Sequence, residues 1–281
     1  MNNTFQSTSI DKISCEPFLR WAGGKRWLLK DLAKFLPTNG YNNYHELFLG
    51  GGAIYFHLQP TKTSFLNDFN PNLIHTYECI KDDVEKVLVE LKKLKNTKDD
   101  YYKIRSKKFR NDYKKAAKFI YLNQTSFNGI YRVNLKGEYN VPYGFRTKDF
   151  VEEENLKLIS KVLKPCVFSS FDFASCLDNI KKNDLVFLDP PYTVAHNNNG
   201  FIKYNQKLFS LEDQYRLAST IEEIKQIGAY YILTNAWHLK IREIFNNGDK
   251  ISKISRASLI GGKNAKRGRY DELIITNVQT I

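Results

Sequence analysis

The chain has 281 residues, 42% of them hydrophobic, which is enough for one large domain or for a core with a smaller inserted domain. No apolar run approaches the roughly 20 residues of a membrane span, and because residues 1–12 are polar we expect no signal peptide. The four cysteines form no CxxC pair and the five histidines lack ligand spacing, so we expect reduced thiols, no metal site and a cytoplasmic location. A net charge of +13 fits either a Lys-rich surface or a polyanionic partner.

Short apolar runs bounded by turn residues predict six strands of a buried sheet. They cover residues 46–49, 64–66, 167–169, 185–188, 230–233 and 272–275. Helical patterns alternate with them, for example from the N-cap Ser210, with Asp213 three residues later, to Gly228 at the C-terminal end. Strands that alternate with helices predict an α/β sheet with helices on both faces.

The alternation stops between about residues 80 and 164, where charged helical patterns precede an irregular polar and aromatic segment. We interpret this stretch as an insertion between two halves of one core. The predicted organisation is residues 1–79 as the first part of an α/β core, 80–164 as an inserted, mainly helical domain, and 165–281 as the second part of the core.

Two motifs of the first part favour a cofactor site. Pro17-Phe-Leu-Arg-Trp-Ala-Gly-Gly-Lys25 precedes the first predicted strand, and it suits a lid over a cofactor or, equally well, a packed turn. The glycines that follow Phe48, beginning with Gly50, let the backbone approach a nucleotide-like ligand, although a tight strand–helix turn also uses them. Asp68 lies 18 residues beyond Gly50, close to the spacing of the ribose-binding acid in dinucleotide-binding folds.

The predicted insertion contains a strongly basic stretch. From Lys103 to Lys118 there are eight basic residues and a single acid, Asp112, with aromatic residues interleaved. We predict one cationic helix that lies along phosphates. The segment 123–144 mixes Asn, Gln, Arg and aromatic side chains with turn glycines. Such side chains read base edges or wedge between bases, and a plain polar β-hairpin is the alternative.

The motif with the clearest chemistry follows the strand at 185–188. It reads Asp189-Pro190-Pro191-Tyr192, and ligands of open α/β sheets bind beyond the carboxyl ends of strands. The prolines stiffen the turn, so that the Asp189 carboxylate and the Pro190 carbonyl can accept both N–H groups of an exocyclic amine while Tyr192 stacks on the base. A proline-rich turn at the end of a core strand is the alternative.

A further acid, Asp172, follows the strand at 167–169 and stands between Phe171 and Phe173. At that place a carboxylate can accept a hydrogen bond from an adenine amine, and a phenylalanine can cover the ring. A surface acid beside two core phenylalanines explains the same residues without a ligand.

Taken together, these motifs resemble the alpha group of Dam/DpnII-like DNA adenine methyltransferases. FLRWAGGK, ELFLGGG, NDFN, FNGIYRVNLKGEYNVPYG and DPPY occur in the order of that family, over about residues 17 to 277. The resemblance implies a Rossmann-like, S-adenosylmethionine-dependent methyltransferase core with an inserted target-recognition domain. It implies transfer of a methyl group to N6 of adenine in a short duplex sequence, with base flipping.

The resemblance also implies roles for individual residues. Catalysis would fall to Asp189, Pro190, Pro191 and Tyr192. The cofactor would contact Trp21, Ala22, Gly23, Lys25, Glu46, Phe48, Gly50, Asp68, Asp172, Phe173 and Asp189. DNA would contact Arg20, Phe127, Asn128, Arg132, Asn134 and Pro142. Phe145, where the family has an arginine, and residues 193–201 depart from the family pattern, which leaves the recognised sequence open.

The implied partner is double-stranded DNA, within a restriction–modification system whose endonuclease makes no stable contact. A monomer or a weak dimer is expected. Methylation of RNA or of a protein amide is an alternative that usually shows Asn in place of Asp189, and N4-cytosine enzymes commonly show Ser there. A non-catalytic DNA-binding module would lose the acids Asp68, Asp172 and Asp189, all of which are present.

Overall fold

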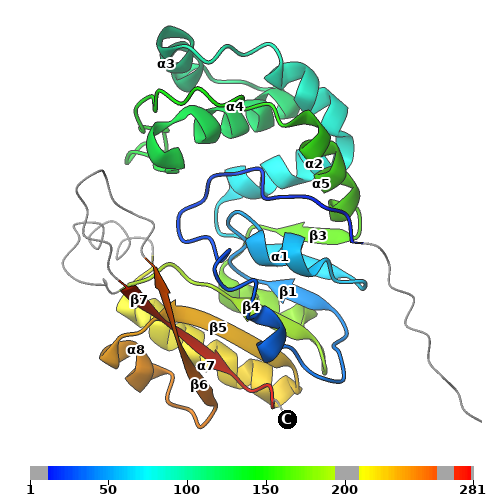
Figure 1. The fold of residues 1–281 in the computed structure, drawn as a ribbon, viewed down its shortest axis with the longest axis vertical. Helices are drawn as coiled ribbons and strands as arrows, with labels where there is room; N and C mark the ends of the chain where they lie inside the picture. The colour runs from blue at the N-terminus through cyan, green and yellow to red at the C-terminus, as the bar shows by residue number, and fades with distance from the viewer. Residues whose placement is uncertain (1–11, 194–208, 258–268, 280–281) are drawn as a thin grey trace, which may run out of the picture.

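The computed structural model describes residues 12–193, 209–257 and 269–279, and within them the chain forms a mixed seven-stranded sheet (Figure 1). The strand order is β3-β2-β1-β4-β5-β7-β6. Strands β1 to β5 pair with one another in parallel, and β7 runs antiparallel to both β5 and β6. The strands are β1 Tyr44–Glu46, β2 Ser64–Asn67, β3 Cys166–Ser169, β4 Leu185–Leu188, β5 Tyr230–Ala236, β6 Lys250–Ala257 and β7 Arg269–Thr276.

The predicted strands coincide with observed ones except at the first. The strand predicted at 46–49 is observed at Tyr44–Glu46, because the chain turns away after Glu46 toward the glycine loop. Strand β6 was not predicted, because Lys and Ser alternate with Ile along it and it lies at the edge of the sheet. The α/β class and the Rossmann-like core are confirmed.

The period of two along the central strands divides the core into two layers. Leu185 and Phe187 of β4 pack on one face of the sheet, with side chains of α1, α2 and α5. Val186 and Leu188 pack on the other face, with side chains of η3, α7 and α8. These helices are α1 Ala53–Leu58, α2 Pro71–Leu91, α5 Glu153–Leu163, η3 Phe173–Asn179, α7 Leu211–Ile227 and α8 Leu239–Ile244.

The helix predicted to follow Ser210 is confirmed in detail. The Ser210 side chain accepts from the Asp213 backbone, the Asp213 carboxylate accepts from the Ser210 backbone, and Gly228 ends the helix with φ of +82°. This capping box fixes the N-terminus of α7 beside the carboxyl ends of the strands.

The helical part above the sheet contains α3 (Lys98–Ser106), α4 (Asp112–Thr125) and the short 3₁₀ turn η2 (Phe127–Gly129) (Figure 1). The single basic helix predicted over 103–118 is wrong: α3 ends at Ser106, and a new helix begins at Asp112. Asn111 caps the new helix, because its side chain accepts from the Lys114 backbone. Residues 107–110 include three cations, which would repel one another in a continuous helix, so the break there is favourable.

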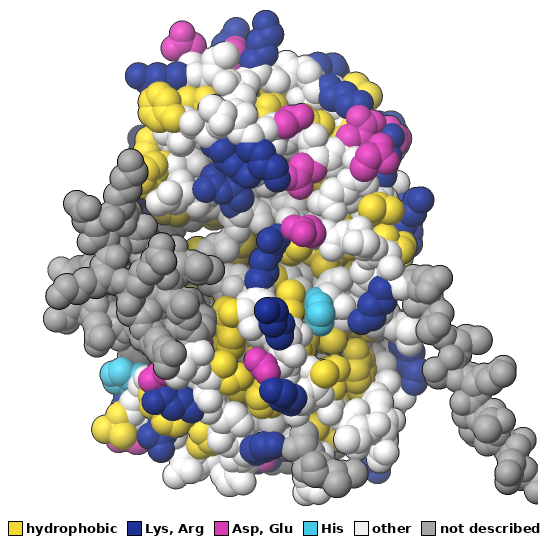
Figure 2. Space-filling model, in the orientation of Figure 1, with side chains coloured by type: hydrophobic (Ala, Val, Ile, Leu, Met, Phe, Trp, Pro, Cys, Tyr) yellow, Lys and Arg dark blue, Asp and Glu magenta, His cyan; other side chains and the backbone are white. Residues whose placement is uncertain are grey.

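Helix α2 runs across residue 80 and is interrupted by non-helical backbone at Asp83. The division of the chain at 79/80 and 164/165 stays a prediction. No helix in the described part of the chain is both long and apolar enough to cross a bilayer. On the face shown in Figure 2, Lys and Arg side chains are spread over the upper, middle and lower parts of the molecule.

Candidate active site

Three acids lie at the carboxyl ends of neighbouring parallel strands. Glu46 is the last residue of β1, Asp68 follows β2, and Asp189 follows β4. Because β1 lies between β2 and β4, the acids meet at one edge of the sheet. The pKa of Glu46 is raised to about 8, most of all by burial and also by the charges of Asp189 and Asp68. Tyr44 donates to Glu46 Oε2 at 2.8 Å and opposes that rise.

Asp189 is held by two donors that reach the same oxygen. Lys25 Nζ lies 2.7 Å from Oδ1, and the Thr234 hydroxyl donates to Oδ1 at 2.7 Å. Lys25 Nζ also donates to the Gly23 carbonyl at 2.9 Å and lies 4.8 Å from the centre of the Tyr192 ring. Burial raises the pKa of Asp189, and the charge and hydrogen bond of Lys25 oppose this. Lys25, predicted beside the cofactor, therefore directly contacts Asp189, a predicted catalytic residue.

Tyr192 is anchored from β7. Its hydroxyl donates to Glu272 Oε2 at 2.6 Å, and Glu272 is fully buried. Two prolines separate Asp189 from Tyr192 in the sequence. Pro190 is buried and Pro191 is half-buried. The sequence analysis missed both Glu272 and Thr234. The available signal was a polar residue at one end of an apolar run that predicts a strand, since such a residue needs a partner when it is buried.

The glycine loop after β1 is fastened by Asp68. Its Oδ2 accepts from the Gly50 backbone and its Oδ1 from the Asn70 backbone, each at 2.9 Å. Gly50 has φ of +50°, and a Cβ there would come within 2.7 Å of the Trp21 indole. The close approach that requires glycine is therefore the approach of Trp21 in this structure. Asp68 has a structural role in addition to the ribose contact that the sequence predicted.

Trp21 joins the loop to the helical part. Its indole stacks on Tyr131 with ring centres 5.9 Å apart and on Phe119 at 6.5 Å. Ala22 and Gly23, which follow it, are exposed. The motif Pro17–Lys25 thus contacts the glycine loop, the helical part and Asp189.

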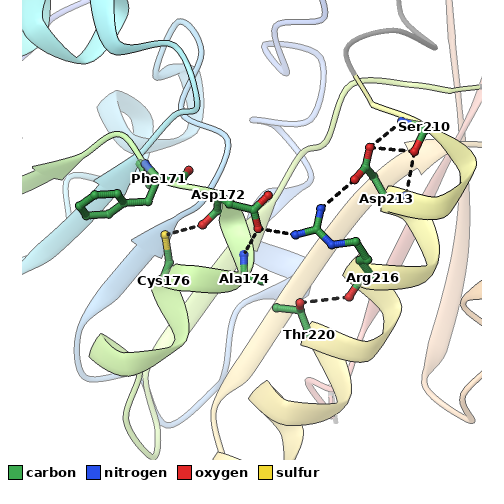
Figure 3. A network of polar contacts seen from close by, with 9 residues as sticks. Phe171, Asp172, Ala174, Cys176, Ser210, Asp213, Arg216 and Thr220 are labelled. Carbon is green, nitrogen blue, oxygen red and sulfur yellow. Dashed lines mark hydrogen bonds and ion pairs between the residues drawn. The ribbon is translucent and has the colours of Figure 1, made fainter.

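Three phenylalanines and an ion-pair network form the next part of this edge. Phe48, Phe173 and Phe209 have ring centres 5.5 to 5.7 Å apart. Figure 3 shows the guanidinium of Arg216, from α7, between Asp172 and Asp213, at 2.7 and 2.8 Å. Both Arg216 and the Ala174 backbone bind Asp172 Oδ1.

Arg216 also covers the site, because its guanidinium lies 4.9 Å from the centre of the Phe173 ring. In Figure 3 the Phe171 ring points away from the network. Asp172 is thus a half-buried, oriented carboxylate beside the buried ring of Phe173, and its predicted contact with a cofactor adenine stays a prediction.

Most of the predicted DNA contacts belong to the turn and hairpin after α4. Phe127 has 51% of its surface exposed, and Asn128 has a left-handed backbone with φ of +54°. The Phe127 backbone donates to the Pro142 carbonyl at 2.9 Å, which joins the two sides of the hairpin. The Arg132 guanidinium, also exposed, donates to the Asn140 side chain at 2.8 Å.

Two predicted DNA contacts have clear structural roles. The Asn134 side chain closes the hairpin turn by accepting from the Lys136 and Glu138 backbones. Arg20 donates to the carbonyls of Gln124 and Ser126, at 3.4 and 3.2 Å, and so caps the C-terminal end of α4. Burial lowers the pKa of Arg20, and the nearby charge of Arg146 lowers it further. The predicted contacts of these residues with DNA stay predictions.

Comparison with known proteins decides the family. A family model described as D12 class N6 adenine-specific DNA methyltransferase matches residues 21–259. The chain belongs to this family. It is 34% identical to the type II methyltransferase M1.LlaDCHI of Lactococcus lactis subsp. cremoris, with 95% of this chain and 97% of that relative covered. It is also 34% identical to the type II methyltransferase M.MjaIII of Methanocaldococcus jannaschii, with 92% and 98% covered.

A DNA adenine methylase of Haemophilus influenzae is 29% identical, with 94% of each chain covered. The present D12-class enzyme is therefore an adenine-specific DNA methyltransferase, as the sequence motifs predicted. Residues 194–201, where the sequence departs from the resembling family after DPPY, lie outside the described residues.

Proposed function

We propose that this enzyme transfers a methyl group from S-adenosylmethionine to N6 of an adenine that has been flipped out of a short duplex recognition site. The observation that carries the proposal is the position of Asp189. It is a charged acceptor at the carboxyl end of the central strand β4, followed by Pro190 and by the anchored ring of Tyr192.

The residues around the three strand ends fit an adenosyl cofactor. Asp172 offers a hydrogen-bond acceptor for its adenine, beside the buried ring of Phe173 that Arg216 covers. Asp68 can take ribose hydroxyls in addition to its two backbone donors, because a carboxylate has about four acceptor positions. Trp21 and the glycine loop close the remaining side. Bound S-adenosylmethionine supplies a methyl group already activated by a sulfonium.

The chain's own residues then have to position a poor nucleophile. The lone pair of adenine N6 is delocalised into the ring, so two acceptors at the amine hydrogens favour a tetrahedral nitrogen. Asp189 and the Pro190 carbonyl provide these acceptors, and Tyr192 stacks on the base. Stacking worth roughly 1–3 kcal/mol offsets part of the few kcal/mol that base flipping costs.

Duplex binding is assigned to the hairpin and the basic residues beside it. The exposed ring of Phe127 is suited to enter the base stack at the gap left by the flipped base. Arg132 is suited to read a guanine edge, since its guanidinium is exposed at the same hairpin. The names of two relatives, type II methyltransferases, support a role in restriction–modification.

The test is to sequence single DNA molecules from cells that express the enzyme, which reports the modified base and its sequence context together. We expect N6-methyladenine within one short motif. Purified enzyme with labelled S-adenosylmethionine should then label a duplex that carries this motif. Label on cytosine, or transfer to RNA or protein in preference to the duplex, would contradict the proposal.

Neutralising Lys107 and Lys108 should weaken DNA binding for all sequences alike. Both are exposed in the connection between α3 and α4. The pKa of Glu138, in the hairpin, is lowered mainly by its hydrogen bond with Asn134 and also by the positive charge of Lys108. Lys108 therefore acts electrostatically on the hairpin. In the variant with Lys107→Gln and Lys108→Gln, the slope of log K against log salt should fall by about 1.8, or 0.9 for each phosphate contact.

The matched control removes two exposed positive charges outside the helical part, with Lys30→Gln just before the 3₁₀ helix η1 (Leu32–Phe35) and Lys34→Gln within it, where Lys34 pairs with Asp31. Its salt slope should equal that of the wild type. A change of sequence preference in the Lys107/Lys108 variant without a change of slope would mean that this surface reads bases.

A further inference from the structure

The two oxygens of Asp189 have different surroundings. Oδ1 accepts from both Lys25 and Thr234, whereas Oδ2 accepts no hydrogen bond from any residue that the structure describes. Thr234 lies on β5, next to the pair in which Leu188 of β4 faces Leu233. Its hydroxyl therefore approaches the first residue after β4 from the neighbouring strand. The orientation of the carboxylate is set from one side and left open on the other.

Lys25 is itself held in place. Its side chain is 5% exposed, its Nζ donates to the Gly23 carbonyl, and its charge lies over the Tyr192 ring. An ammonium that keeps three such contacts has little freedom to leave Asp189. Lys25 thereby connects the two side chains of the catalytic motif that the proposed function uses.

We propose that Lys25 and Thr234 are positioning residues for methyl transfer: together they hold Asp189 Oδ1 and direct Oδ2 toward the adenine amine. This inference rests on the proposed function, since it needs Asp189 to accept from N6. It assigns Thr234 a role that the motifs did not indicate, and it moves Lys25 from the cofactor to the reacting base.

The electrostatics of the pocket give Lys25 a second effect. Asp189 is faced by Glu272 on β7, whose charge raises the pKa of Asp189, and by Glu46 on β1, whose own pKa is raised to about 8 in part by the charge of Asp189. Burial raises the pKa of Asp189 most, while Lys25 and the Thr234 hydroxyl lower it. Loss of Lys25 therefore raises this pKa further. A protonated Asp189 cannot use the same oxygen as an acceptor, so transfer should fail at a higher pH than in the wild type.

The experiment measures single-turnover methylation against pH, with a duplex that carries the sequenced motif and saturating S-adenosylmethionine. The variants are Lys25→Met, Lys25→Arg, Thr234→Val and Thr234→Ser. Arg26→Met is the control, because Arg26 is exposed and pairs with Glu16 on the surface. A second readout is the fluorescence of 2-aminopurine at the target position, which rises when the base leaves the stack.

We expect Lys25→Met to lower the rate about 100-fold at neutral pH and to shift the acid limb of the profile to higher pH, with partial recovery in alkali. Thr234→Val should lower the single-turnover rate about tenfold, and Thr234→Ser should keep most of the wild-type rate, because serine retains the hydroxyl. Lys25→Arg should keep the wild-type position of the acid limb. The 2-aminopurine signal should persist in all of them, because the base still flips.

Two different failures are distinguishable. A wild-type enzyme that transfers no methyl group to adenine overturns the proposed function. An active wild type with Thr234→Val equally fast and Lys25→Met unshifted in pH overturns this inference alone. If Lys25→Met does not fold, the Thr234 pair still decides: equal rates for Thr234→Val and the wild type reject the positioning role.

Discussion

Asp189→Ala should abolish methyl transfer, with a loss of at least about 1,000-fold in the single-turnover rate, while DNA binding is largely kept. The substitution removes the charged acceptor at the amine and leaves the Pro190 carbonyl. DNA affinity comes mainly from phosphate contacts, which we assign to basic residues such as Lys107 and Lys108 rather than to Asp189. Cofactor affinity should fall modestly, because the loop after β4 borders the same pocket.

The structure adds a cost for stability. Asp189→Ala leaves the Lys25 ammonium buried with only the Gly23 carbonyl and the Tyr192 ring. Removing one partner of a buried ion pair lowers the free energy of unfolding by up to about 3–5 kcal/mol. Asp189→Asn keeps the shape and one acceptor oxygen, so it should be less destabilised and still strongly impaired. Circular dichroism before each assay shows whether the protein is folded.

The matched control is Asp99→Ala at the exposed N-terminus of α3, which should leave transfer unchanged. The measurement is the amount of labelled methyl group on the duplex in one turnover. Transfer by folded Asp189→Ala at near the wild-type rate would refute the assigned mechanism.

The sequence was sufficient for those parts of the fold that depend on local patterns. β4 was predictable because four apolar residues run directly into a proline turn, and α7 because Ser210 and Asp213 form a capping box. β6 escaped prediction, because the alternating Lys and Ser of an edge strand look like a surface loop. The break between α3 and α4 was not predicted, because the run of basic residues suggested one helix although Asn111 is a favourable N-cap residue.

The site was predictable in its motifs and not in its connections. Asp189 and Tyr192 were identified from the chemistry of one short motif. The side chains that orient them, Thr234 and Glu272, come from other strands, and only the order of strands in the sheet brings them near. Arg20 has a structural contact that its motif did not indicate. Its position in the motif predicts that it reads a base, and in the structure its guanidinium donates to two backbone carbonyls at the end of α4.

Asp68→Ala should weaken S-adenosylmethionine binding by roughly 10- to 150-fold, because a carboxylate that binds ribose hydroxyls makes charge-assisted hydrogen bonds worth roughly 1.5–3 kcal/mol. The loss includes a second component in this enzyme. Asp68 also fixes the backbones of Gly50 and Asn70, so its removal loosens the glycine loop under Trp21. Calorimetric titration with the cofactor measures the change, with Asp99→Ala as the control.

The pH dependence of the same titration tests whether the charge of Asp68 contributes. Burial raises the pKa of Asp68, and the backbone donors of Asn70 and Gly50 oppose this. Since ribose binding uses the ionised form, wild-type affinity should fall as the pH drops, beginning above the ordinary pKa of an aspartate. In Asp68→Ala that part of the pH dependence should disappear. An unchanged dissociation constant in folded Asp68→Ala would contradict the ribose contact. Asp68 would then only hold the glycine loop, and another residue would have to bind the ribose.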